Sequence, residues 1–385
     1  MAIVRNEATG LVILMAGIAA VGIQALMLSP LLPDIAATLA AGPREIGVAS
    51  GAYGAGVALL ALIAAPRLGF WPKARAIQLS FGVMALGLAL CAFAWDWRVL
   101  VAGQFVAGAA SGIIIPGTYA LTTEIATPEK RSRAIGKVLF GWSIAMVAGI
   151  PVAAFIADFA GWRGSFAVVA IIAAAMIFAI ALLMPQPAAL ETKLVRYADA
   201  LRVAGIPLVL VATFAYMIGF YQTYTFVGDY IRHLHQAGAW LGGLLACSYG
   251  LGFGAAIALD GWIDRVGARR LMAVALFLVG LNYAVLPFAL LNVWTAVAYP
   301  LLWGLANHLC MNTLVSFIGQ SPPEERATAM GLFSFVTYLA VFVGGAVYGS
   351  IYAGQGFMTV SLAATATLWI ATVLVSIMLP RRATA

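Results

Sequence analysis

Apolar residues along this chain gather in runs of about twenty, separated by short polar stretches. A helix needs about 20 apolar residues to cross the hydrocarbon core of a bilayer, so each run predicts a membrane-spanning helix. The first run is too long for a signal-peptide core and others follow it, so we expect it to be retained. Twelve segments are predicted, at 10–33, 46–66, 76–95, 99–121, 138–158, 164–184, 204–228, 238–259, 270–290, 293–316, 328–351 and 357–379.

The composition agrees with a membrane protein and excludes the soluble class. Hydrophobic residues make up 64% of the chain and charged residues 9%, whereas an average soluble domain has about 25% charged residues. The formal net charge of +7 does not indicate nucleic-acid binding, because the basic residues lie in short clusters between apolar runs. The three cysteines lie inside apolar stretches and imply no disulfide framework.

The Lys and Arg distribution predicts the orientation in the membrane, because short cytoplasmic loops carry an excess of these residues. With the N-terminus in the cytoplasm, 17 of the 21 basic residues fall in inside segments. The outside loops then hold Arg44, Arg98, Arg163 and Arg232. We therefore expect a multi-pass protein of the plasma membrane, the inner membrane in a bacterium, with both termini in the cytoplasm and lipids around it.

The longest loop divides the predicted spans six to six. This predicts a six-helix bundle over 1–185, a cytoplasmic linker over 186–203 and a second six-helix bundle over 204–385. Within the linker, Leu190, Leu194, Tyr197 and Leu201 fall on one helical face, which is typical of a helix lying on the membrane surface. A flexible linker is the alternative.

An internal repeat relates the two bundles. The stretch 128–136 (PEKRSRAIG) matches 323–331 (PEERATAMG) in Pro, Glu, Arg, Ala and Gly at an offset of 195, which continues through Phe140/Phe335 and Gly149/Gly344. A second match joins 67–69 to 265–267 at an offset of 198. Such repeats indicate two halves related by an axis along the membrane normal.

On these motifs the chain resembles the major facilitator superfamily over nearly its whole length. The stretch 264–270 (DRVGARR) is similar to the family's cytoplasmic signature, with Asp260 where a glycine is usual, and its first-half copy has Pro66 in place of the aspartate. Gly149 and Pro151 resemble the proline-glycine motif of the family's antiporters, and 161–166 (GWRGSF) resembles the outer turn of bacterial drug and sugar efflux members. Gln104 stands where those exporters often carry arginine.

The resemblance implies a monomer in which spans one, four, seven and ten line a central cavity. Aromatic surfaces with a few hydrogen-bonding groups suit a small-molecule pocket, and packing between helices is the alternative for each side chain. The substrate-binding candidates are Gln24, Ser111, Tyr216, Tyr221, Gln222, Trp303, Asn307 and His308, with Tyr224 closer to the outer interface.

Charge is absent from the predicted span interiors, which disfavours phosphorylated anions and organic cations as substrates. His308 is the titratable side chain well inside a span. It could bind substrate, carry a coupling proton, or form a structural hydrogen bond. Asp34 could also carry the proton, with a helix cap or gate contact as the alternative. A copper site at His308, Cys310 and Met311 lacks a further evident ligand, so we predict neither a metal nor a cofactor.

Two further groups of residues suggest moving parts. The signature residues Asp264, Arg265, Arg269 and Arg270, with Arg67 and Glu124 as the first-half counterpart, are predicted to form a gate. Simple anchoring by positive charge is the alternative. Gly149 and Pro151 mark a hinge or a static kink, since proline removes a backbone hydrogen bond from a helix.

These features predict an all-α transporter that exports a small neutral, aromatic or weakly acidic compound in exchange for protons. Uptake or facilitated diffusion of a small metabolite is the alternative, and a membrane sensor without transport is a more distant one. An enzyme is not expected, because Ser111 in the stretch 108–112 (GAASG) has no histidine placed as its base by a recognisable pattern. The expected partners are the substrate, protons and lipids, with no nucleic acid.

Overall fold

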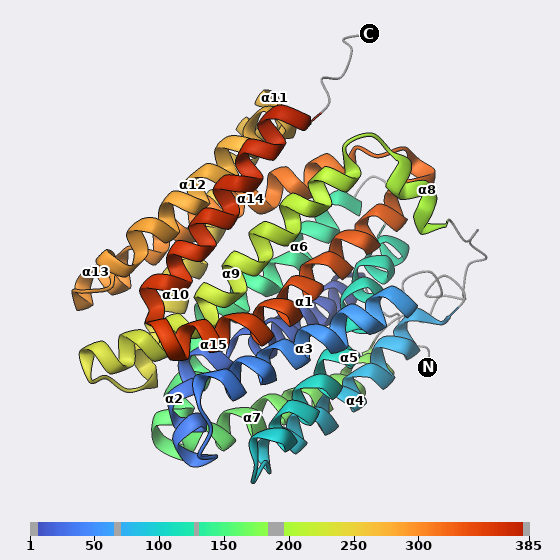
Figure 1. Cartoon of the computed structure of the whole chain (residues 1–385). Coiled ribbons are helices and arrows are strands. Elements are labelled where there is room, and N and C mark those ends of the chain that lie inside the picture. The colour runs from blue at the N-terminus through green and yellow to red at the C-terminus, as the bar shows by residue number, and fades with distance from the viewer. Residues whose placement is uncertain (1–6, 65–70, 127–130, 184–195, 380–385) are drawn as a thin grey trace.

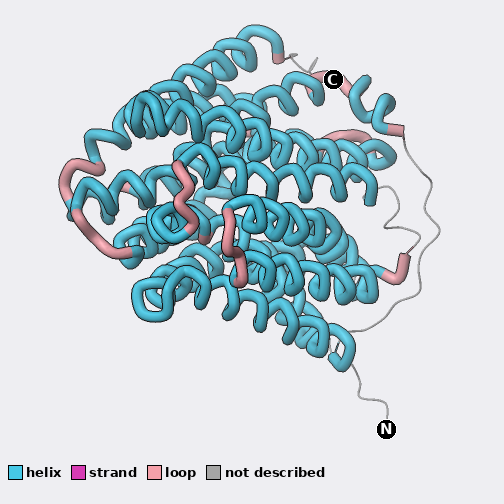
Figure 2. The backbone as a smooth tube through the Cα atoms, turned by 60° about the horizontal axis from the view of Figure 1, so that its bottom comes forward, coloured by secondary structure: helices cyan, strands magenta, loops and turns pink. Residues whose placement is uncertain are grey.

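The computed structural model describes residues 7–64, 71–126, 131–183 and 196–379, and in these ranges the chain forms helices and no strand (Figure 1 and Figure 2). This confirms the predicted all-α fold. The elements in chain order are α1 (Glu7–Leu26), α2 (Leu28–Thr38), α3 (Pro43–Ala64), α4 (Lys73–Ala92), α5 (Trp97–Ile125), α6 (Arg131–Ile144), the π-helix η3 (Ala145–Gly149), α7 (Ile150–Leu183), α8 (Tyr197–Arg202), α9 (Ile206–His235), α10 (Ala239–Ala255), the 3₁₀ helix η4 (Ala256–Leu259), α11 (Asp260–Val266), α12 (Ala268–Ala289), α13 (Val293–Ala298), α14 (Pro300–Gly319) and α15 (Pro323–Met378).

Ten described segments are long and apolar enough to cross a membrane, and two of these are far too long for one crossing. Ala134–Leu183 has 50 residues and Thr328–Met378 has 51, which at 1.5 Å per residue is about 75 Å. Each is interrupted by a glycine with positive φ, Gly161 at 75° and Gly356 at 78°. At the first of these the chain folds back, since the Ser165 hydroxyl donates to the Ala153 carbonyl at 2.6 Å. The membrane fold is therefore confirmed, while the number of twelve crossings stays a prediction.

The backbone repeats at the same spacing as the sequence. Gly161 and Gly356 are 195 residues apart, the offset of the sequence repeat. Among the described residues, the two non-glycine positions with positive φ are Ala40 at 47° and Gln236 at 51°, which are 196 apart. The chain therefore turns at equivalent places in α1–α7, called here the first half, and in α9–α15, called the second half.

Proline explains where two predicted spans are divided. The first predicted span, 10–33, is α1 and α2 with a break at Met27. Pro30 lies in the first turn of α2 and Pro300 opens α14, positions where a missing backbone N–H leaves no helical bond unmade. Of the predicted linker helix, the structure describes the six residues of α8, because 184–195 lie outside the described residues. The domain boundaries stay a prediction.

The two halves meet along α3 and α15 through small residues. A Cβ built on Gly47 would lie 2.8 Å from the Gly345 carbonyl oxygen, and one on Gly54 would lie 2.6 Å from the Val341 Cβ. Only residues without a side chain allow helices to approach this closely. Gly345 on α15 and Gly47 on α3 therefore pack one half against the other.

The two ends of the helical bundle are named here by the elements that lie at them. The linker end is where α8 and α11 lie, and the far end is where α2 ends and α13 lies (Figure 1). At the linker end the Tyr197 hydroxyl donates to the Leu62 carbonyl at 2.9 Å, so α8 of the linker contacts the end of α3. The contacts between α3 and α15 described above run from Gly47, near the far end, to Gly54 in the middle of α3.

Candidate functional site

An aromatic cluster lies between the helices of the second half. It consists of Phe220 and Tyr224 on α9, Tyr249 on α10, Tyr283 on α12 and Trp303 on α14. The ring centroids are 5.1 Å apart for Tyr249 and Trp303, 5.6 Å for Phe220 and Tyr249, and 5.8 Å for Tyr283 and Trp303. These separations are within the range of favourable ring pairs, so the cluster presents rigid aromatic surface.

Polar atoms within and beside this cluster are only partly satisfied. The Asn307 Nδ2 donates to the Tyr249 hydroxyl at 3.0 Å, and the Tyr216 hydroxyl donates to the Asn307 carbonyl at 3.1 Å. The Trp303 Nε1, the Tyr224 hydroxyl and the Asn307 Oδ1 are buried without a hydrogen-bond partner among the described residues. An unsatisfied buried polar atom costs about 1–3 kcal/mol. These atoms are fully buried, and the Trp303 and Asn307 side chains also interact with Tyr283, so a ligand would reach them when the surrounding helices move.

Aromatic contacts continue from the second half into the first. The ring centroids of Tyr221 on α9 and Tyr338 on α15 are 6.5 Å apart, and those of Tyr338 and Tyr53 on α3 are 6.3 Å apart. Tyr53, Tyr221 and Tyr338 are all buried. Movement of the two halves would change these contacts.

The first half contributes a pair of neutral amides. The Gln24 Nε2 donates to the Gln104 Oε1 at 2.8 Å, and both side chains are buried. One acceptor, the Gln24 Oε1, and one donor, the Gln104 Nε2, have no partner among the described residues. Gln104, which by resemblance stands where bacterial exporters often carry arginine, is thus part of a hydrogen-bonded pair of amides.

Two predicted substrate residues have hydrogen bonds to the backbone instead. The Ser111 hydroxyl donates to the Ala107 carbonyl of its own helix at 3.0 Å. The Gln222 amide lies against α15, where its nitrogen can donate to the Gly344 carbonyl and its oxygen can accept from the Gly345 N–H, each at 3.1 Å. The structure therefore brings Tyr216, Trp303 and Asn307 together, whereas Ser111 bonds within its own helix and Gln222 faces the backbone of α15.

His308 pairs with an aspartate that lies 48 residues earlier in the chain. The imidazole Nε2 of His308 on α14 lies 2.8 Å from the Oδ1 of Asp260, the first residue of α11. The same oxygen accepts from the Asn312 Nδ2 at 2.7 Å. The Phe253 ring packs edge-on against the imidazole, with centroids 4.9 Å apart. His308 and Asp260 thus join α14 to α11 through a hydrogen bond.

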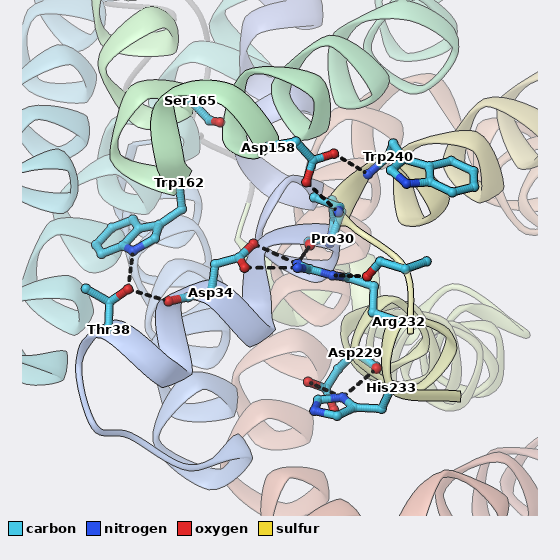
Figure 3. Close-up of polar contacts among 12 residues, drawn as sticks. Pro30, Asp34, Thr38, Asp158, Trp162, Ser165, Asp229, Arg232, His233 and Trp240 are labelled. Carbon is cyan, nitrogen blue, oxygen red and sulfur yellow. Dashed lines mark hydrogen bonds and ion pairs between the residues drawn. The ribbon is translucent and has the colours of Figure 1, made fainter. Parts of the chain in front are cut away.

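The far end carries two charged contacts between the halves (Figure 3). Arg232 on α9 binds both carboxylate oxygens of Asp34 on α2, at 2.7 and 2.9 Å, and also donates to the Pro30 carbonyl at 2.8 Å. The carboxylate of Asp158 on α7 accepts the backbone N–H groups of Ala239 and Trp240 at 2.8 and 3.0 Å. An aspartate of the first half therefore caps the N-terminus of α10 in the second half.

The predicted gate residues at the linker end are described only in part. Arg67 and the side chain of Asp264 lie outside the described residues. Glu124 pairs with Lys73 at 2.6 Å, a partner that the sequence analysis did not name. An Arg269 guanidinium nitrogen donates to the Leu379 carbonyl at 3.0 Å. The side chains of Arg265 and Arg270 are exposed. The gate at this end stays a prediction.

The predicted hinge coincides with an irregular helical turn. The π-helix η3 ends at Gly149, two residues before Pro151. A wider π turn accommodates a proline that cannot donate to the preceding turn. A Cβ on Gly149 would overlap the Ile23 side chain, so this turn packs tightly on α1. Movement at this turn, the predicted hinge, stays a prediction.

Several residues of these sites were missed because their partners are distant in sequence. Asp260 was visible only as a departure from a signature, and Arg232 only as a basic residue in an outside loop. Tyr249 carried no signal beyond an aromatic residue in a predicted span. Composition alone does not reveal which helix faces they occupy.

Comparison with known proteins agrees with this architecture. A family model described as Major Facilitator Superfamily matches residues 14–345. The MFS-type transporter YwfA of Bacillus subtilis is 27% identical over 354 residues, covering 90% of this chain and 86% of the relative. A probable sugar efflux transporter of Helicobacter pylori is 25% identical, covering 88% of each chain, and one of Pasteurella multocida is 23% identical, covering 86% of this chain and 83% of the relative.

Proposed function

This chain is a multi-pass membrane transporter of the major facilitator superfamily, and we propose that it exports a small neutral, aromatic or weakly acidic compound in exchange for protons. Its substrate would bind between the halves, and the halves would rock to expose the site to each side of the membrane in turn. The binding residues would be Trp303, Asn307, Tyr216 and Tyr221 of the second half, with Gln24 of the first.

The observation that carries this proposal is the character of the buried centre. Its aromatic cluster offers flat surface, and the available hydrogen-bonding atoms belong to Trp303, Tyr224, Asn307, Gln24 and Gln104, all uncharged. Such a site favours a ligand with an apolar face and a few hydroxyl or carbonyl groups. A sugar has both features, and two of the relatives are named probable sugar efflux transporters.

The charged contacts at the far end fit a conformation that is closed on the outer side. The basic residues predict that the linker end faces the cytoplasm, so the far end would face outward. Asp34 with Arg232, and Asp158 with the N-terminus of α10, join the halves there. In this conformation the far end would be closed, and these contacts would have to break before an exported substrate could leave.

Proton coupling is assigned to His308 rather than to Asp34. Both oxygens of the Asp34 carboxylate are bound by Arg232, an arrangement that favours the gate alternative for Asp34, because guanidinium remains charged at any physiological pH. His308 is buried inside a span and already paired. We assign Gly149 and Pro151 to the hinge on which the halves move.

A ligand screen followed by transport tests this function. Compounds that bind the folded state raise its melting temperature by mass action, and the panel contains sugars, neutral aromatics, organic anions, organic cations and copper. Trp303→Leu should weaken binding of the identified compound at least tenfold. Trp294→Leu is the matched control, because Trp294 on α13 is 82% exposed and should leave binding unchanged.

Transport is then measured in everted membrane vesicles with the compound identified by the screen. We expect uptake into the vesicles that stops when an ionophore collapses the pH gradient. Stabilisation by organic cations or copper alone would contradict the proposed substrate class. Transport that ignores the pH gradient would instead support the alternative, facilitated diffusion or uptake of a small metabolite.

A further inference from the structure

A short 3₁₀ segment positions an acidic side chain inside a membrane segment. Helix α10 ends at Ala255, η4 follows, and α11 begins at Asp260, all within the apolar segment Ala239–Ile263. Short 3₁₀ stretches inside longer helices often mark a functional hinge. An ionisable side chain in a membrane segment is costly and suggests a function. Asp260 therefore calls for an explanation beyond packing.

The partner of Asp260 is held in a single orientation. The His308 side chain is 10% exposed, and its Nε2 faces the Asp260 Oδ1 at 2.8 Å. The Asn312 Nδ2 donates to the same oxygen, and the Asn312 Oδ1 in turn accepts from the Ser316 hydroxyl at 2.9 Å. These bonds fix the carboxylate, so the Nε2–H of a neutral imidazole would point at it.

The other imidazole nitrogen is free to accept a proton. The His308 Nδ1 is buried without a hydrogen-bond partner among the described residues. When Nε2 carries the hydrogen that bonds to Asp260, Nδ1 presents a lone pair. The pair of Asp260 and His308, called here the dyad, then has one negative charge, carried by the carboxylate. A proton added at Nδ1 gives an imidazolium–carboxylate pair without net charge.

The charged residues on the elements packed around this dyad do not neutralise it. Arg265 on α11 and Arg270 on α12 are exposed, and so is Lys137 on α6. Arg269 on α12 binds the Leu379 carbonyl. The side chain of Asp264 lies outside the described residues. Among the described contacts, the negative charge of Asp260 is therefore met by His308 and the amide of Asn312.

Resting on the proposed function, we infer that Asp260 and His308 together form the site of the coupling proton. The proton adds to the Nδ1 of His308 and leaves from the same atom, and Asp260 holds the imidazolium through Nε2. The Asp260 side chain is 36% exposed, so it lies at the boundary between the protein interior and its surroundings. In this assignment Asp260 positions and stabilises the proton carrier and does not itself release the proton.

The titration of His308 tests this inference without a known substrate. The chain has three histidines, so a His233→Asn, His235→Asn background leaves a single imidazole for NMR in the full-length protein. Asp260→Asn should shift the titration curve of the His308 imidazole, because it removes the carboxylate that faces its Nε2 at 2.8 Å. Asp199→Asn on the exposed helix α8 is the matched control and should leave the titration unchanged.

Two further measurements separate the possible failures. Asp260→Glu keeps the carboxylate and should retain the titration curve of the parent, which also guards against misfolding of Asp260→Asn. An unchanged titration in Asp260→Asn would overturn the dyad. In proteoliposomes, coupling that persists in both Asp260→Asn and His308→Gln would overturn it too, whereas wild-type transport that ignores the pH gradient would overturn the proposed proton-driven export instead.

Discussion

Removal of the Arg232 guanidinium should open the far end of the transporter. Arg232 makes a two-pronged ion pair with Asp34 and a third bond to Pro30. The side chains are 11% and 36% exposed, so the pair lies between the surface class, worth about 0–1 kcal/mol, and the buried class, where breaking a pair costs about 3–5 kcal/mol.

Because the ion pair is partly buried, Arg232→Gln should remove about 1.5 kcal/mol of interaction free energy, a value between those of the two classes. The contact joins α2 to α9, and thus one half to the other, so its loss is felt in the equilibrium between closed and open far ends. Since about 1.4 kcal/mol corresponds to a factor of ten, the population with an open far end should rise roughly tenfold.

Cysteine labelling measures this population. Ser29 is 4% exposed, and its hydroxyl donates to the Tyr224 carbonyl across the two halves. In a background without the three native cysteines, Ser29→Cys should react with a membrane-impermeant maleimide about ten times faster when Arg232→Gln is added. Combining Asp34→Arg with Arg232→Asp should restore slow labelling, since the ion pair is rebuilt in reverse.

Arg163→Gln is the matched control, because Arg163 is an arginine near the same end whose guanidinium donates to the Ala94 carbonyl within the first half. It should leave the labelling rate unchanged. Equal labelling in the parent and Arg232→Gln, or an equal rise in Arg163→Gln, would refute the assignment of Arg232 to closure of the far end.

Three other substitutions test packing and charge elsewhere. Lys73→Met leaves Glu124 14% exposed and unpaired, so it should cost about 3 kcal/mol and lower the melting temperature, and adding Glu124→Leu should recover most of that loss. Gly54→Val places a side chain against Val341 and should speed labelling at position 29 and slow transport. Gly354→Val, where an added Cβ meets no described atom within 4 Å, should do neither. Asp158→Ala removes the cap of α10, worth about 1 kcal/mol, and should raise labelling roughly fivefold; an unchanged rate would show that the cap does not hold the halves together.

The sequence by itself determined the class of protein and the layout of its helices. Bilayer thickness fixes the length of an apolar run, so the runs could be read without knowledge of any contact. The repeat at an offset of 195 predicted two related halves, and the backbone repeats it at Gly161 and Gly356. Both glycines adopt a positive φ that side-chain-bearing residues rarely take, so each turn depends on a local property of glycine.

Only the tertiary structure decided which side chains meet. Asp34 and Arg232 are 198 residues apart, Gln24 and Gln104 are 80 apart, and Asp260 and His308 are 48 apart. Spacing along a helix determines which residues share a face, but the rotation and neighbours of that helix come from packing against other helices. A uniformly apolar span gives no amphipathic stripe from which to read that rotation. For this reason His308 could be chosen as a candidate from the sequence, whereas its partner Asp260 could not.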